Sequence, residues 1–579
     1  MFRRFFMQVT ALMLAAVLIL PSAWAAESSS DWVRVGLAYG SGALVNANLE
    51  NNTGFGSGYR LGYFGDDLNF VELARTDAQE TQITMIKTQN TWVNGSSYSN
   101  SDNGGSAIGC YHVLLERGFS SYQQAASAAS PYSDGFVAWI EGEYQVRAGA
   151  YTSESAAQAA AQSLGGTTVG TSSYAVNVTR TGSTQILFQF DGGAALSLGV
   201  MPDVTGADSV RTWFKGSRYY GGFRYERIGG GNLTVVNIVD LETYIKGVIP
   251  YEMSNSWPLE ALKVQAVCAR SYAYNNIHNS RHSSSHFDVC STTDCQLYLG
   301  AGPTTSSYQA NARTDQAVEE TAGEYAWYAG QVIEAFYSSS HGGASESVYH
   351  VWGSSLETYP YLCGVMDPYE ADMDSKNSYS SWTVSYTSSE LAQRLQNYGY
   401  NTSSGIASLT LTYSDLGNVI QVRVNYNNGE SSTIKPNSTY GIRSSFGVSS
   451  IHFTVNGQGS SSGSSSSSGI LDVNGSGTLE DQDSYVVISG SGTQNQVDRE
   501  DLYAISGSGS VTSVGEGTDS SSGTPSGTQV TVSGNSYTFQ GGGNGHQLGL
   551  SQYGAWAMVE RGFTYQEVIE FYYPGTYVQ

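Results

Sequence analysis

The fold of this chain is organised around one stretch, Tyr244-Ile-Lys-Gly-Val-Ile-Pro-Tyr-Glu-Met-Ser-Asn-Ser-Trp-Pro-Leu-Glu-Ala-Leu-Lys-Val-Gln-Ala-Val-Cys-Ala-Arg270. A turn punctuated by Gly and Pro carries Glu252, and a run of helix-forming residues follows it. We expect Ser256 to cap this helix, Pro258 to occupy its first turn, and Glu260 to place a negative charge near its N-terminus. Glu252 is therefore expected outside the helix, in the turn that precedes it.

The composition indicates a weakly charged protein of several domains. The chain has 579 residues, enough for two to four domains that each bury a core. Charged residues make up 13%, well below the roughly 25% of average soluble proteins, and the formal net charge is −24. This negative charge argues against nucleic acid or an anionic membrane as a partner and is compatible with glycans.

The N-terminus has the layout of a secretory signal peptide. Arg3 and Arg4 precede an apolar run, and Ala23-Trp-Ala25 offers a small-residue cleavage site. We expect a secreted or cell-wall protein, outside the cytoplasm, with cleavage favoured over an uncleaved anchor. No later stretch approaches the ~20 apolar residues that a membrane span needs, so no span is expected after cleavage.

The cysteines suggest a local site. Five cysteines are too few for a disulfide-built scaffold. His286-x3-Cys290-x4-Cys295 has the donor types that suit a structural zinc, with His282, Asp294 or water as the fourth ligand. A Cys290–Cys295 disulfide remains equally open, because an oxidising compartment permits it.

Two copies of a strand, turn and helix pattern occupy residues 111–126 and 144–159. Each has alternating apolar positions and then a Ser or Thr cap before an Ala-rich run. The pair resembles the SPOR domain, a small module that binds peptidoglycan glycan strands stripped of their stem peptides. Two generic strand and helix units within an enzyme domain are the alternative.

Four separated motifs resemble the SpoIID/LytB family of bacterial cell-wall proteins. They occupy residues 240–273, 288–300, 335–362 and 543–576, and include Trp257-Pro-Leu-Glu-Ala-Leu-Lys and Gly543-Asn-Gly-His-Gln-Leu-Gly-Leu-Ser-Gln-Tyr-Gly-Ala555. The resemblance implies an α+β fold in which a discontinuous SpoIID-like domain holds a small SPOR-like α/β insertion. The expected parts are a signal peptide (1–25), a β-rich N-terminal part (26–105), the SPOR-like module (106–180), the core (181–456), a Ser/Gly-rich flexible insertion (457–530) and the C-terminal part of the core (531–579).

The resemblance also implies a reaction. Some family members are lytic transglycosylases that cleave the MurNAc–GlcNAc bond of peptidoglycan, and their acid falls on Glu252. Because the 6-hydroxyl of the sugar attacks, one carboxyl group suffices where an ordinary glycosidase needs two. Glu252 should then be partly desolvated, which raises its pKa. Glu260 is the rival acid, better explained as a partner of the helix dipole.

Further motif positions are expected to bind substrate: Gln296, Ser339, His546, Ser551 and Gln552. The C-terminal glycines would let the backbone approach a sugar closely, or they serve only tight packing. Ser339, Ser340 and His341 give only a weak hydrolase signal, since no acid stands at a defined spacing. The chain departs from the family at Gln547, where glycine is usual, and at Asp294, where histidine is frequent.

Three functional classes follow from these patterns. The first is a lytic transglycosylase that needs no cofactor for its chemistry, acts on peptidoglycan glycan strands in wall remodelling or sporulation, and has Glu252 as its acid. The second is a wall-binding protein that enhances a separate amidase, because family members of this kind share the framework. A surface structural or adhesion protein is the third, and it leaves the Glu252 motif unexplained.

Overall fold

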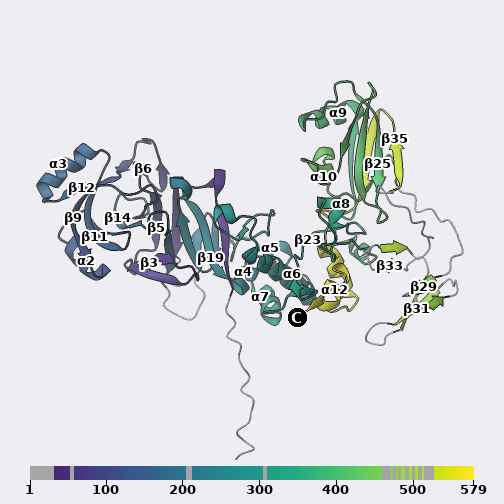
Figure 1. Cartoon of the computed structure of the whole chain (residues 1–579), viewed down its shortest axis with the longest axis horizontal. Helices are drawn as coiled ribbons and strands as arrows, with labels where there is room; N and C mark the ends of the chain where they lie inside the picture. Colours follow the sequence, from purple (N-terminus) through teal and green to yellow (C-terminus); the bar gives the residue numbers. More distant parts are fainter. Residues whose placement is uncertain are drawn as a thin grey trace, which may run out of the picture.

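The computed structural model of the chain describes residues 31–51, 58–203, 211–303, 310–459 and 527–579, with the backbone of short strands between 471 and 513. N-terminal sheets, a central group of helices and C-terminal sheets follow one another along the long axis, and the C-terminus returns to the central helices (Figure 1). The combination of helices and mixed sheets confirms the α+β class. The expected signal peptide (1–25) and most of the expected insertion (457–530) lie outside the described residues.

The N-terminal region is built from two large sheets that share one core. Side chains such as Val35, Leu61, Val137 and Phe188 pack together between the sheets. The seven-stranded sheet has the order β20 (Val289–Cys290), β1 (Trp32–Ala38), β19 (Thr234–Asp240), β18 (Gly222–Glu226), β15 (Leu198–Pro202), β3 (Tyr59–Phe64) and β4 (Phe70–Arg75).

Both copies of the strand and helix repeat contribute their strands to the ten-stranded sheet. Its order is β12 (Thr167–Val169), β9 (Tyr111–Phe119), β11 (Glu143–Tyr151), β10 (Gly135–Ile140), β14 (Ile186–Asp191), β13 (Val176–Arg180), β5 (Gln82–Lys87), β2 (Asn46–Asn51), β16 (Thr212–Phe214) and β17 (Ser217–Tyr219). Helices α2 (Tyr122–Ala129) and α3 (Glu154–Leu164) follow β9 and β11, and Ser121 and Ser153 cap them. The two predicted strand and helix copies are present, and with β10 and β12 they form a βαββαβ unit.

This unit is not a separate body. Strand β10 pairs in parallel with β14, so the unit continues into the larger sheet. A small sheet of β7 (Ser97–Ser99), β6 (Thr91–Asn94) and β8 (Ser106–Ile108) supplies Val93 and Ile108 to a core that covers Phe136 and Ala138 of β10. Part of the sheet face opposite the helices is therefore closed.

Helix α6 (Leu259–His278) joins the two halves of the molecule. Its neighbours are α4 (Leu241–Lys246), α5 (Ile249–Glu252) and α7 (Ala312–Glu320). One side of α6, including Leu262, packs into the N-terminal core, while Val264 and Val267 pack into the C-terminal core. The helix begins after Pro258, and Ser256 makes no cap, which corrects the sequence expectation. Ser256 instead lies 3.0 Å from Ser254, hydroxyl to hydroxyl.

The C-terminal half consists of small sheets and short helices around the second core. One sheet consists of β21 (Ala326–Tyr328), β22 (Gln331–Val332) and β38 (Tyr577–Val578), and a second pairs β23 (Tyr337–Ser338) with β37 (Leu550–Ser551). A third consists of β24 (Trp382–Thr387), β36 (Ser536–Gly541) and β28 (Phe453–Val455). A fourth consists of β27 (Ser431–Ile434), β26 (Val419–Tyr426), β25 (Ile406–Tyr413) and β35 (Gln529–Val532). The helices are α8 (Val348–Trp352), α9 (Ser388–Asn397), α10 (Gly441–Phe446), α11 (Gln552–Glu560) and α12 (Tyr565–Tyr572). Short hairpins pair β29 (Leu471–Val473) with β30 (Gly477–Leu479), β31 (Ser484–Ile488) with β32 (Gln494–Asp498), and β33 (Tyr503–Ile505) with β34 (Val511–Ser513).

Candidate active site

Glu252 is the last residue of α5, between the tight turn at Gly247 and the long helix α6. Gly247 packs so closely on Tyr298 and Gly300 that an added Cβ would lie 2.5 Å from the Tyr298 ring. Pro250 lies in the first turn of α5, where its missing N–H costs no hydrogen bond. The local sequence therefore fixes the backbone that carries Glu252.

The Glu252 carboxyl group is half-buried among polar partners. The backbone N–H of Leu297 donates a hydrogen bond of 2.9 Å to its Oε1. Burial raises the pKa of Glu252 above its usual range, while Leu297, the Tyr337 hydroxyl and the Gln552 side chain act in the opposite direction. The hydroxyl of Tyr337 is itself fully buried, and the charge of Glu252 contributes to the rise of its pKa. A carboxyl group in this environment is suited to hold and release a proton.

Glu252 opens into a cleft of about 590 Å³. Aromatic side chains dominate its walls: Tyr251, Trp257, Tyr379 and Tyr553. Among the described residues that line the cleft, Glu252 is the only carboxylic acid. Flat aromatic walls with a single acid suit a sugar chain more than a charged small molecule.

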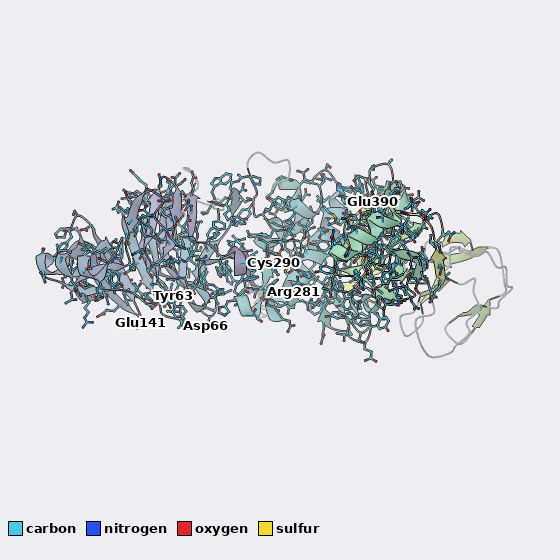
Figure 2. All side chains as sticks on the ribbon, turned by 90° about the horizontal axis from the view of Figure 1, so that it is seen from above. Tyr63, Asp66, Glu141, Arg281, Cys290 and Glu390 are labelled. Atoms are coloured by element: carbon cyan, nitrogen blue, oxygen red, sulfur yellow. The ribbon has the colours of Figure 1, made fainter. Side chains whose placement is uncertain are left out.

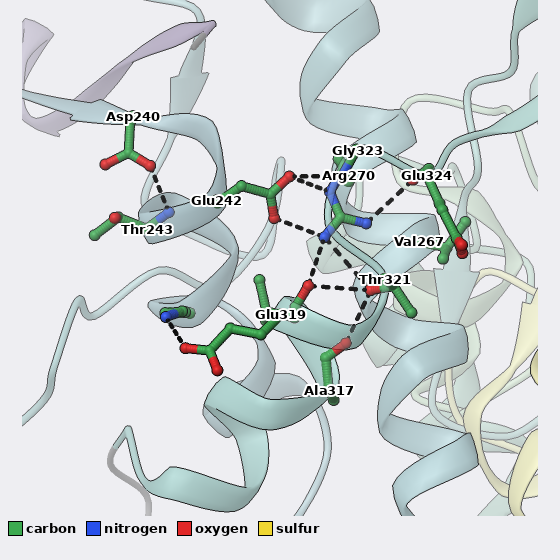
Figure 3. Close-up of polar contacts among 12 residues, drawn as sticks. Asp240, Glu242, Thr243, Val267, Arg270, Ala317, Glu319, Thr321, Gly323 and Glu324 are labelled. Carbon is green, nitrogen blue, oxygen red and sulfur yellow. Dashed lines mark hydrogen bonds and ion pairs between the residues drawn. The ribbon is translucent and has the colours of Figure 1, made fainter. Parts of the chain in front are cut away.

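Helix α4 is tied to α6 by an ion pair between a buried arginine and a partly exposed glutamate. Arg270 of α6 has no exposed surface, and its Nε and one terminal nitrogen donate to the carboxylate of Glu242 at 2.8 and 2.7 Å. Figure 3 shows Arg270 between Glu242, Thr321 and the backbone carbonyl of Glu324. This network fixes the helices that flank α5 and so the position of Glu252.

The structure brings some of the expected site residues to the cleft and places others elsewhere. Ser339 and Gln552 line the cleft beside Glu252. Gln296 is buried and bonds Tyr244 and the carbonyl of Ala269, so it holds the segment that carries Leu297. Glu260, the rival acid, pairs with Lys263 at 2.9 Å and is not among the cleft residues.

Two further residues expected to bind substrate have other positions. Ser551 is fully buried, caps α11 through the N–H of Gly554, and donates to Glu370 at 2.9 Å. His546 lines a different pocket, with its ring centre 5.5 Å from that of Trp352. The sequence does not show that Gln552 lines the cleft while Ser551 and His546 do not, because these positions depend on contacts with distant segments.

The C-terminal glycines pack backbone against backbone. A Cβ on Gly342 would lie 2.5 Å from the backbone of Gly542, and a Cβ on Gly543 would lie 2.7 Å from His341. Gln547 has a φ of 63°, a conformation that favours glycine. Its buried side chain accepts from the N–H of Ile451 at 2.7 Å and donates to the carbonyl of His341 at 2.9 Å. These glycines serve loop packing at the described contacts.

A group of potential metal ligands lies near the cleft. Ligand atoms of His282, Cys290, Asp294 and Cys295 all lie within 4.8 Å of one another. Nε2 of His282 lies 3.1 Å from Sγ of Cys295, and both cysteines are free thiols. Two thiols, an imidazole and a carboxylate are donors that zinc accepts, so these residues fit the ion.

The expected ligand His286 does not belong to this group. It follows a short 3-10 turn with a φ of 61°, and its imidazole lies 2.5 Å from the carboxylate of Glu226. The histidine one turn earlier, His282, takes its place. Figure 2 labels Cys290 close to Arg281, whose guanidinium pairs with the Asp294 carboxylate at 2.7 Å.

Several residues of the cleft were missed by the sequence analysis. Tyr337 and Leu297 approach the Glu252 carboxyl group, and Tyr251, Trp257 and Tyr553 form the walls. Tyr251 and Trp257 lie close to Glu252 in the same motif, which was a usable signal, whereas Leu297, Tyr337 and Tyr553 lie in the other three motifs. Tyr379 lies outside every motif, and no sequence feature marks it.

Comparisons with known proteins show similarity to bacterial sporulation and amidase-enhancer proteins. Residues 229–328, which include Glu252, match the SpoIID family model, described as stage II sporulation protein. The amidase enhancer of Bacillus subtilis (strain 168) is 32% identical over 346 residues, which are 57% of this chain and 40% of that protein. Stage II sporulation protein D of the same organism is 30% identical over 171 residues, 28% of this chain and 48% of that protein.

An uncharacterized protein of Brachyspira hyodysenteriae is 37% identical over 183 residues, 32% of this chain and 45% of that protein. The chain thus spans less than half the length of each of these curated relatives. Among the described residues, no helix has both the length and the apolar character that crossing a membrane requires.

Proposed function

We propose that this chain is a peptidoglycan lytic transglycosylase that acts outside the cytoplasm, with Glu252 as its acid and base. The observation that carries the proposal is the position of Glu252, a half-buried acid that opens into a cleft with aromatic walls. No second carboxylic acid stands among the described residues of that cleft. An ordinary glycosidase would need a second carboxylic acid in the cleft.

The proposed reaction uses the same carboxyl group twice, first as an acid and then as a base. Protonated Glu252 gives its proton to the glycosidic oxygen as the bond to C1 of MurNAc breaks. The 6-hydroxyl of the same sugar then bonds to C1, and the Glu252 carboxylate takes the hydroxyl proton. The products are a 1,6-anhydro-MurNAc end and a new GlcNAc end, and the enzyme returns to its protonated form.

The protein side chains have distinct roles in this scheme. Burial keeps Glu252 protonated at higher pH than a free glutamate, and the Leu297 N–H stabilises the carboxylate when it forms. Gln552 and Ser339 offer hydrogen bonds to sugar hydroxyls, and Trp257 offers a flat face. Zinc at His282, Cys290, Asp294 and Cys295 would stabilise the segment before Leu297 and take no part in the reaction.

Incubation with purified glycan strands tests this function. The wild-type chain should release 1,6-anhydro-MurNAc products and Glu252→Gln should release none above background. Glu260→Gln, which changes a carboxylate of the same region outside the cleft, should retain activity. Equal product from Glu252→Gln would refute the assignment.

The alternative is a wall-binding protein that enhances an amidase. The similarity to the protein named amidase enhancer extends over 346 residues and so reaches beyond the SpoIID domain. Stimulation of a wall amidase that is the same with Glu252→Gln, without anhydro products from the wild type, would favour this function.

The βαββαβ unit supports a SPOR-like contribution to wall binding. It consists of two similar halves, each a strand, a Ser-capped helix and a second strand. On the face opposite the helices, β6 to β8 cover β10, so we propose that glycan contacts β9 and β11 on the remaining part of that same face. Leu114→Asp, a charge in the middle of β9, should reduce sedimentation with stripped glycan strands. Unchanged sedimentation would exclude this face.

A further inference from the structure

The pocket that contains His546 is a candidate binding site separate from the Glu252 cleft. It has a volume of about 280 Å³, and α8, α10 and the loop between β27 and α10 supply most of its walls. None of its described lining residues lines the Glu252 cleft. This volume lies just below the roughly 300–1,000 Å³ of pockets for drug-sized ligands, so a small group would fill it.

Arg443 of α10 is the charged residue of this pocket. Its Nε is buried without a hydrogen-bond partner, and no carboxylate of a described residue forms an ion pair with it. Burial lowers the pKa of Arg443, and no acidic group offsets that effect. Arg443 as a whole is half-buried, and its buried Nε has neither a hydrogen-bond partner nor a carboxylate beside it, so an anionic ligand could pair with it.

The residues around Arg443 indicate that the ligand of this pocket carries one negative charge. Among the described lining residues none is acidic, and Arg443 is the only Lys or Arg. His546 is held neutral, since burial and the nearby Arg443 lower its pKa to about 4. A single guanidinium matches the planar fork and the single charge of a carboxylate better than the nearly double charge of a phosphate.

The remaining walls indicate what the carboxylate is attached to. Val351, Ile442 and Ile451 give an apolar side that suits a small aliphatic group. Trp352 and Tyr440 stand partly open to solvent, with 42% and 48% of their surface exposed. These two rings stand beside Arg443 at the same pocket and offer flat surfaces to the aliphatic part of a ligand.

We propose that this pocket binds the terminal carboxylate of a short peptide with small apolar side chains. Arg443 would hold the carboxylate and Trp352 would cover the aliphatic part. Two sources share this chemistry, a cell-wall stem peptide and the C-terminus of a protein. We favour the stem peptide, and this choice rests on the proposed wall function. A stem peptide ends in D-alanine, whereas a protein ends in an L-amino acid, so the two sources can be distinguished.

Isothermal titration calorimetry of the full chain with D-alanyl-D-alanine tests the pocket. We expect measurable binding, at least tenfold weaker binding of the C-terminal amide, and at least a tenfold loss with Arg443→Gln. Arg443→Lys should retain part of the affinity, because it keeps the charge. Arg423→Gln, which removes an exposed arginine bonded only to Ser431, is the matched control and should change nothing.

The outcomes separate this inference from the proposed function. Dipeptide binding should be unchanged by Glu252→Gln, so failure of the glycan assay leaves the pocket supported. Equal or tighter binding of L-alanyl-L-alanine would assign the pocket to a protein C-terminus and overturn the stem-peptide source. No binding by the wild type, equal affinity of acid and amide, or full affinity of Arg443→Gln would overturn the carboxylate site.

Discussion

The backbone N–H of Leu297 donates to Oε1 of Glu252 at 2.9 Å, although 45 residues separate the two. Leu297 lies two residues after Cys295, a member of the metal-ligand group, and directly after Gln296, which bonds α6. The acid and its supporting donor are thus contributed by different segments that α6 holds together. The predictions below follow from this arrangement.

Glu252 should reduce the stability of the fold at neutral pH. Burial raises its pKa in the folded state above that of the unfolded chain. The protonated form therefore contributes stability that is fully present below the unfolded-state pKa and is lost as pH rises through the folded-state pKa. Glu252→Gln should melt at a higher temperature than the wild type at pH 7, and the difference should vanish at pH 4. A difference independent of pH would contradict the burial of this acid.

Arg270 should be essential for stability. Arg270→Met leaves the Glu242 carboxylate without its buried partner and breaks bonds to two backbone carbonyls. Because the Glu242 side chain is 35% exposed and water can reach it, the loss comes mainly from the unpaired backbone carbonyls and should be about 1–3 kcal/mol. Urea unfolding followed by circular dichroism measures this loss. Arg423→Met, an exposed arginine on β26, should change the unfolding free energy by less than about 0.5 kcal/mol.

Gln547 should tolerate glycine better than alanine. Either substitution leaves the N–H of Ile451 without its buried acceptor, at a cost of about 1–3 kcal/mol. Alanine also keeps a Cβ at a φ of 63°, and glycine does not. Gln547→Gly should therefore be about 1 kcal/mol more stable than Gln547→Ala in urea unfolding. The reverse order would show that backbone conformation does not limit this position.

The sequence predicted the parts of this site that local chemistry determines. Glu252 follows from the motif before α6, and the βαββαβ pattern follows from capping and periodicity. It could not predict that Ser551 is buried while the adjacent Gln552 reaches the cleft. That difference depends on Glu370, which lies 181 residues from Ser551 and has no motif of its own.

The metal ligands illustrate the same limit. Spacing alone favoured His286, but a left-handed backbone turns its ring toward Glu226 on a strand 60 residues away. The apolar pattern from Gln331 to Tyr337 predicts one buried strand, but the structure has two short strands with four residues between them. The turn residues Asp415-Leu-Gly-Asn418 predict a hairpin over residues 408–425, and the structure confirms it as β25 and β26. Non-local contacts decided the first two outcomes, and local turn chemistry decided the third.

The cysteine group should bind zinc rather than form a disulfide. The free thiols of the structure predict that all five cysteines react with a thiol reagent after denaturation without reductant and with a chelator. Elemental analysis should find zinc in the native chain, and Cys290→Ser should lose it, while Cys110→Ser should keep it. Two fewer reactive thiols, with no zinc, would establish the Cys290–Cys295 disulfide instead.

The origin of the new sugar ends tests the central claim most directly. Glycan strands should be cleaved in H2(18)O, and the ends should be analysed by mass spectrometry. Attack by the sugar's own 6-hydroxyl predicts 1,6-anhydro-MurNAc ends without 18O from the wild type, and no cleavage by Glu252→Gln. Reducing MurNAc ends that carry 18O, or anhydro ends made equally well by Glu252→Gln, would contradict the single-acid mechanism.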